Sequence, residues 1–63
     1  MTFYVAFRLK RKNARRRIAA RFILPDEESA KRDFKKFVET SSQSNIEYEL
    51  LTGDWKHILF MEK

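Results

Sequence analysis

A run of basic residues between positions 8 and 21 is the part of this sequence whose side chains are best suited to chemistry. Its fourteen residues, RLKRKNARRRIAAR, include eight Lys or Arg and no Asp or Glu. Clustered cations attract phosphate backbones, because each phosphate that they neutralise releases a condensed counterion. Arg also matches phosphate and guanine edges with paired hydrogen bonds. The run therefore predicts a site for an anionic polymer.

We expect that polymer to be nucleic acid, either DNA or RNA, bound mainly through its phosphates. Tyr4 shares a strand face with Arg8 and Lys10, which makes it a candidate for stacking on bases. Trp55, in the last turn, is a weaker candidate. The predicted nucleic-acid-binding residues are Arg8, Lys10, Arg11, Lys12, Arg15, Arg16, Arg17, Arg21 and Tyr4.

Two other interpretations of the basic run stay open. An acidic surface of a protein partner would satisfy the same cations, and the chain would then be a small inhibitor or adaptor of the kind that viruses also encode. The run could equally be a solvated turn whose charges discourage pairing at a sheet edge. A membrane is not an expected partner, because the run does not have the pattern of an amphipathic helix.

The distribution of charge along the chain supports a binding role for the run. Residues 1–25 carry a formal charge of +8 and residues 26–63 carry −3, within a net charge of +5. This division predicts a dipolar surface with one strongly positive end.

The sequence contains no recognisable catalytic or metal-binding pattern. His57 is the only histidine and has no partners at ligand spacing, so we expect it to be structural. There is no cysteine, which excludes disulfides and thiolate sites. Glu47 and Glu49 fall on one strand face and are expected to form salt bridges. We therefore predict no enzyme activity, no catalytic residues, no metal site and no cofactor.

The basic run must be positioned by a β-hairpin, because apolar residues alternate on both sides of it. In TFYVAFRLK and RRIAARFIL the period of two is typical of half-buried strands. Asn13 tolerates a left-handed backbone and is the expected turn residue. The side chains expected to point outward on the second strand are Arg17, Ala19, Arg21 and Ile23, and those expected inward are Ile18, Ala20, Phe22 and Leu24.

A helix and a second hairpin are predicted for the rest of the chain. Pro25 ends the second strand, and Asp26 is suited to cap a helix that ends near Thr40. The sequences IEYELL and KHILFMEK predict two more strands, joined by a TGDW turn in which Gly53 is expected to adopt positive φ. Which residues of the last strand face inward depends on its register, and the pattern leaves this open.

The predicted fold is α+β, a single domain over residues 1–63. It is a two-layer β-β-α-β-β structure, with one helix packed on a four-stranded, mostly antiparallel sheet. The third strand could lie beside the first, in the order 2-1-3-4, or beside the second. The predicted core residues are Phe3, Val5, Phe7, Leu9, Ile18, Ala20, Phe22, Leu24, Phe34, Phe37, Val38, Ile46, Tyr48 and Leu50.

One helix can cover only one face of such a sheet. The other face is predicted to mix basic, acidic and apolar side chains. It is either a solvated surface in which Arg8 or Arg21 pairs with Glu47 or Glu49, or a docking surface for a second copy or another protein. A homodimer is compatible with either functional hypothesis.

The absence of cysteine, of an export signal and of a long apolar segment favours a cytoplasmic, intracellular location.

Overall fold

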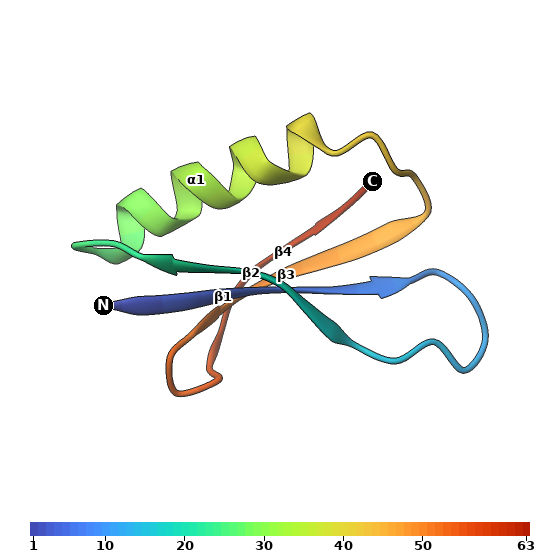
Figure 1. The fold of residues 1–63 in the computed structure, drawn as a ribbon, viewed down its shortest axis with the longest axis horizontal. Coiled ribbons are helices and arrows are strands. Elements are labelled where there is room, and N and C mark those ends of the chain that lie inside the picture. The colour runs from blue at the N-terminus through green and yellow to red at the C-terminus, as the bar shows by residue number, and fades with distance from the viewer.

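The strand and helix patterns of the sequence produce one sheet and one helix. A computed structural model, which describes residues 1–63, contains β1 (Thr2–Leu9), β2 (Arg17–Ile23), α1 (Glu27–Thr40), β3 (Ile46–Thr52) and β4 (His57–Glu62). The helix lies along one face of the sheet, as Figure 1 shows. The predicted α+β class and the β-β-α-β-β order are confirmed.

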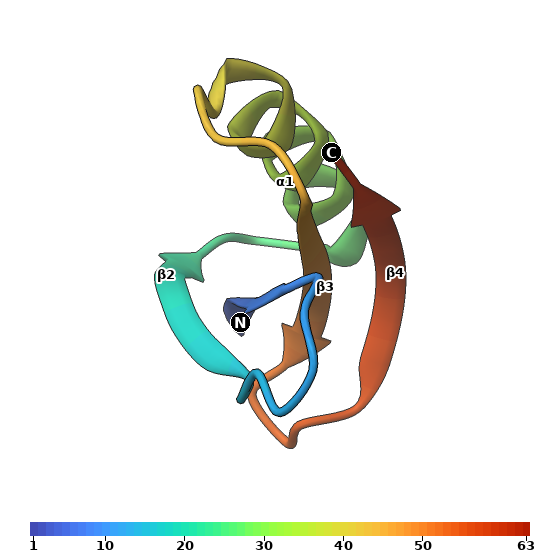
Figure 2. The ribbon, with the colours of Figure 1, turned by 90° about the vertical axis from the view of Figure 1, so that its right-hand side faces the viewer.

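The order of strands in the sheet is β2-β1-β3-β4, and all three neighbouring pairs are antiparallel. The third strand therefore lies beside the first, which was one of the two predicted arrangements. This places β2 and β4 at the two edges of a strongly twisted sheet (Figure 2). We call the face that packs against α1 the inner face and the opposite face the outer face.

Both ends of α1 are capped by side chains. Asp26 accepts a hydrogen bond of 2.8 Å from the backbone N–H of Ser29, as predicted for an N-cap. That hydrogen bond lowers the pKa of the Asp26 carboxyl. At the other end, the Nζ of Lys63 donates to the carbonyl oxygens of Val38 at 3.0 Å, of Glu39 at 2.9 Å, and of Ser41. The carbonyl of Val38 also accepts a hydrogen bond from the backbone N–H of Ser41 at 3.2 Å. A cation at this end of the helix suits the helix dipole.

The core lies between α1 and the inner face. Its eight fully buried residues come from β1, β3 and the apolar stripe of the helix, and most of them were predicted. They are Phe3, Val5, Ala30, Phe34, Val38, Ile46, Tyr48 and Leu50. In β4, Leu59 and Met61 lie opposite Leu50 and Tyr48, so these two side chains face inward and Phe60 faces outward.

The inward position predicted for Ile18 is wrong. Val5 pairs with Ala20 but Ala6 pairs with Ile18, so Ala19 is an extra residue in β2. Such a β-bulge exchanges the faces of the residues that precede it. Ile18 consequently lies on the outer face with 47% of its surface exposed, and Arg17, predicted outward, pairs with inward-facing Phe7.

The prediction for the last turn is also wrong in its detail. Gly53 does not have a positive φ; Trp55 does, with φ of 67°. Gly53 instead lies close to β1, and a Cβ on it would make a tight contact of 3.3 Å with the carbonyl oxygen of Thr2. Trp55 adopts a backbone conformation that is rare for a bulky residue.

Candidate nucleic-acid interface

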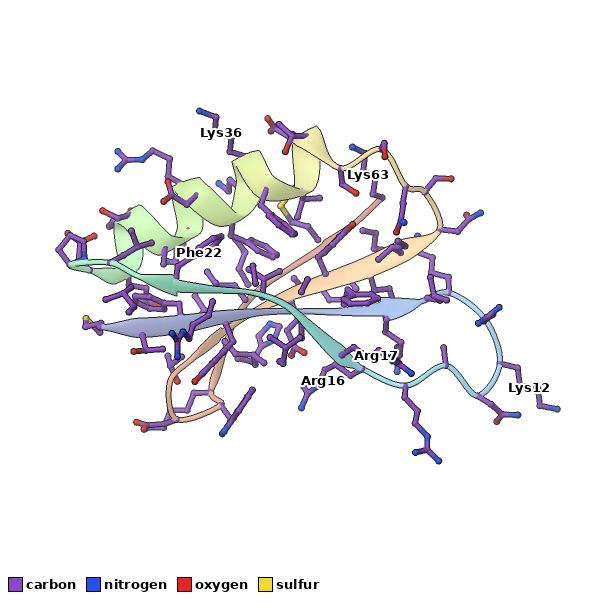
Figure 3. All side chains as sticks on the ribbon, in the orientation of Figure 1. Lys12, Arg16, Arg17, Phe22, Lys36 and Lys63 are labelled. Carbon is purple, nitrogen blue, oxygen red and sulfur yellow. The ribbon has the colours of Figure 1, made fainter.

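The hairpin loop, residues 10–16, extends beyond the paired part of β1 and β2. Asn13 lies within it at φ of 65°, which confirms the predicted turn residue. The backbone N–H of Lys10 donates to the carbonyl oxygen of Asn45 at 2.9 Å, so the start of the loop is attached to the segment that precedes β3. Lys12 points away from the body of the molecule at the end of the loop (Figure 3).

Three of the predicted binding residues are in ion pairs with the sheet. Arg8 lies 2.6 Å from Glu47, and Lys10 lies 2.6 Å from Glu62. Arg16 lies 2.9 Å from Glu49. The prediction that Glu47 and Glu49 form cross-strand salt bridges is confirmed, with Arg8 but not Arg21 as one of their partners.

Glu49 is the centre of the largest of these groups. One carboxylate oxygen accepts from Arg16, and Nδ1 of His57 lies 2.6 Å from the other. Partial burial acts to raise the pKa of Glu49, but the hydrogen bonds and charges of His57 and Arg16 outweigh it, and the pKa is lowered. An ionised Glu49 therefore holds the end of the hairpin loop against β3.

The other five predicted cations have no carboxylate within 4.0 Å. Four of them gather around the hairpin loop, and the fifth lies on the edge strand β2. All five are exposed. The acids of β3 and β4 thus neutralise the cations next to the sheet and leave the excess positive charge at the loop. The unpaired residues are Arg11, Lys12, Arg15, Arg17 and Arg21.

The β-bulge determines which of the neighbouring arginines Arg16 and Arg17 lies on which face of the sheet. Arg16 reaches Glu49 on the outer face, whereas Arg17 lines a hollow with Phe7 and Leu9 of the inner face. Three consecutive arginines in extended backbone must alternate between faces, so the sequence did signal that both faces would be basic. It did not signal the exposed apolar surface of Phe7 and Leu9 beside them.

Tyr4 is not brought together with the hairpin loop. Its ring stacks on Trp55, with centroids 4.6 Å apart and planes inclined by 10°. The pair lies on the outer face towards the start of β1, whereas the loop follows the end of that strand. One ring face of each residue is therefore occupied within the chain.

Other features of the structure bear on what this surface can do. No group of three or more His, Asp or Glu side chains lies close enough together to hold a metal ion. The single helix is too short and too polar to cross a membrane. Comparison with protein-family models, with curated proteins and with solved structures found no match.

Proposed function

We propose that this protein binds the phosphates of nucleic acid through the hairpin loop. The observation that carries the proposal is the placement of the acids. Glu47, Glu49 and Glu62 pair with Arg8, Arg16 and Lys10, next to the sheet. No carboxylate lies within 4.0 Å of Arg11, Lys12, Arg15 or Arg17. Three unpaired cations in the loop and a fourth, Arg17, at the start of β2 repel each other, and a polyanion relieves that repulsion while releasing its counterions.

The roles of the basic residues differ. Arg11, Lys12, Arg15 and Arg17 are free to contact phosphates directly, and Arg21 extends the positive surface along β2. The paired cations Arg8, Lys10 and Arg16 hold the hairpin in place and add to the local potential. Binding of this kind is largely independent of sequence, because phosphate contacts carry no base identity.

The test is a titration of labelled single-stranded DNA, duplex DNA and RNA at several salt concentrations. Four or five phosphate contacts give a log-log salt slope of about −3 to −4. In an Arg15→Ala/Arg17→Ala variant the slope should become less steep by about 1 to 2. A Lys35→Ala/Lys36→Ala variant removes the same charge from the exposed face of α1 and should change the slope much less.

The proposal fails if no nucleic acid binds near physiological salt, or if the loop and helix variants lose affinity equally. In that case the loop would be free for an acidic protein surface, and a synthetic poly-Glu peptide would be the first probe. Binding of that peptide with loss in the loop variant would support the alternative function of an inhibitor or adaptor.

A second candidate function, self-association, is favoured by the contrast between the two sheet edges. The β2 edge carries Arg17, Arg21 and a bulge, all of which oppose pairing with another strand. In β4 the residues from Ile58 to Met61 are uncharged, and Figure 2 shows that no other strand lies along the edge of β4 that faces away from β3. Ile46 and Lys63 exchange both backbone hydrogen bonds. In an antiparallel ladder, residues that bond to the partner strand alternate with residues whose N–H and C=O point away from it. Lys63 is of the first kind, so Phe60, three residues earlier, is of the second kind. The N–H and C=O of Phe60 therefore point towards the free edge of β4.

Two copies of β4 can therefore pair antiparallel about a two-fold axis at Phe60. Cα atoms of such a pair are about 5.5 Å apart, which is within reach of a disulfide. Since the chain has no cysteine, Phe60→Cys should oxidise rapidly to a linked dimer at low protein concentration. Ile23→Cys, on the β2 edge, is the matched control. Equal rates for the two variants, or a monomeric wild-type mass near 7.7 kDa at high concentration, would exclude this dimer.

A further inference from the structure

A hollow of about 710 Å³ opens beside the hairpin loop. It is lined by Phe7 and Leu9, which are only partly buried at the margin of the core, and by Asn13 and Ala14 of the loop. Its other four lining residues are the cations Arg11, Lys12, Arg15 and Arg17. The volume is within the range of sites that hold small ligands.

The hollow exists because neighbouring elements end before β1 does. Pairing between β1 and β2 stops at Phe7 and Arg17, and Leu9 has a partner only in β3, at Ile46. The helix contacts β3 and β4, and Figure 1 shows that it ends short of the end of β1 that leads into the hairpin loop. An aromatic ring and an aliphatic side chain are consequently left partly exposed beside four unpaired cations.

We infer that this hollow receives an unstacked nucleobase, so that the protein prefers single-stranded nucleic acid to a duplex. This inference rests on the proposed function. Single-strand sites combine cations that follow the backbone with aromatic side chains on which bases stack. The hollow offers Phe7 as the stacking surface, with Arg15 and Arg17 placed to contact the phosphates on either side of the base.

The chemistry of the hollow distinguishes between ligands. A small inorganic anion would bind to the cations but would leave Phe7 and Leu9 exposed. A duplex would present phosphates to the cations, but its bases are paired and stacked, and bringing one to Phe7 requires it to be flipped out at a cost in free energy. A single strand offers phosphates to the cations and an unpaired base to Phe7 without the free-energy cost of flipping a base out of a duplex.

The test compares three labelled ligands of the same length, about 12 nucleotides, which is a typical site size for one small domain. They are an oligo(dT) strand, the same backbone with abasic sites in place of the bases, and a duplex. Fluorescence anisotropy near physiological salt should show that oligo(dT) binds at least about five-fold more tightly than the abasic strand, since stacking one base typically contributes this much or more. The duplex should also bind more weakly than oligo(dT).

Two variants locate the base. Phe7→Leu removes the ring but keeps an apolar side chain, and it should reduce the difference between oligo(dT) and the abasic strand to near unity. Phe22→Leu removes a partly buried ring that pairs with Phe3 and does not line the hollow, and it should leave that difference unchanged. Circular dichroism verifies that both variants are folded. If Phe7→Leu does not fold, the affinities of the wild-type protein for the three ligands still show whether binding depends on an unpaired base.

Equal affinity for oligo(dT), the abasic strand and the duplex would overturn the inference while leaving phosphate binding by the loop intact. A base-dependent difference that persists in Phe7→Leu would also overturn it, because the base would then bind elsewhere. Absence of binding to all three ligands would instead be the failure of the proposed function itself.

Discussion

The guanidinium of Arg16 lies 2.9 Å from Oε1 of Glu49, which connects the end of the hairpin loop to the middle of β3. Nδ1 of His57 lies 2.6 Å from the other oxygen of the same carboxylate. Both contacts favour the ionised form of Glu49. The position of the loop is consequently coupled to the protonation of one acid.

This coupling predicts how stability depends on pH. The pKa of Glu49 is lower in the folded protein than its usual value of 4.5, so the stabilisation is present above that value and is lost as the pH falls through the folded pKa. Glu49→Gln should therefore lower the melting temperature by a few degrees at pH 7, since a half-exposed pair contributes about 1 kcal/mol or less. At a pH well below the folded pKa of Glu49, wild type and variant should melt together.

Thermal unfolding followed by circular dichroism between pH 3 and pH 7 measures this difference. Glu28→Gln is the control, because Glu28 has no cation within 4.0 Å. A constant difference between wild type and Glu49→Gln across the whole range would show that the ionisation of Glu49 does not contribute.

A second prediction concerns a gain of affinity. Glu62 neutralises Lys10 at 2.6 Å, at the start of the hairpin loop. Glu62→Gln would release Lys10 for phosphate contact, so the salt slope should become steeper by about 0.7 to 0.9 and the affinity for nucleic acid should rise. Glu28→Gln changes the net charge equally, but on α1, and should have a smaller effect. Equal gains in the two titrations would mean that net charge, and not the loop, determines binding.

Hydrophobic alternation and capping residues were enough to predict the elements of this fold. Apolar and polar residues alternate along β1 and β3, which predicted that only one face of the sheet would pack against the core. Pro25 and Asp26 predicted the start of α1. The strand order could not be predicted, because both β1 and β2 offered an apolar face to β3. In the structure β3 pairs with β1, and this places Arg8 opposite Glu47.

The errors in the predicted hairpin have one physical source. Ala19 and Ala20 are adjacent small residues that fit either face of a sheet, so the sequence gives no sign of a bulge between them. The inserted residue exchanged the faces of Ile18 and Arg17. The basic character of the loop was evident from composition, whereas the hollow over Phe7 depends on where β2 and α1 end.

A third prediction separates stacking from backbone strain in the last turn. Trp55 stacks on Tyr4 but occupies a left-handed conformation at φ of 67°. Trp55→Ala should lose the stacking and keep the strain, whereas Trp55→Gly should lose both. Because the left-handed conformation costs a residue with a Cβ about 1 kcal/mol, Trp55→Gly should be more stable than Trp55→Ala by about that amount.

Urea unfolding of the two variants gives the comparison directly. Tyr4→Ala measures the stacking without altering the turn, and it should cost about 1 kcal/mol. If Trp55→Ala were as stable as Trp55→Gly, the turn would be free to relax and Trp55 would not be held under strain.

The fourth prediction concerns the C-terminal end of α1, where Lys63 donates to three backbone carbonyls from one ammonium group. Lys63→Met keeps most of the aliphatic chain and removes the donors and the charge. The free energy of unfolding should fall by about 1 kcal/mol, which lowers the melting temperature of a domain of this size by about 4–8 °C. The amide protons of the last helical turn, including that of Ser41, should also exchange faster with solvent.

Lys56→Met is the matched control, since Lys56 has no carboxylate within 4.0 Å and its backbone, not its side chain, bonds to Thr52. Equal melting temperatures for the two variants would show that water replaces Lys63 at the helix end without loss. A fall in melting temperature without faster exchange at Ser41 would place the contribution of Lys63 beside β3, just after the end of β4, where its backbone pairs with Ile46, and not in the cap.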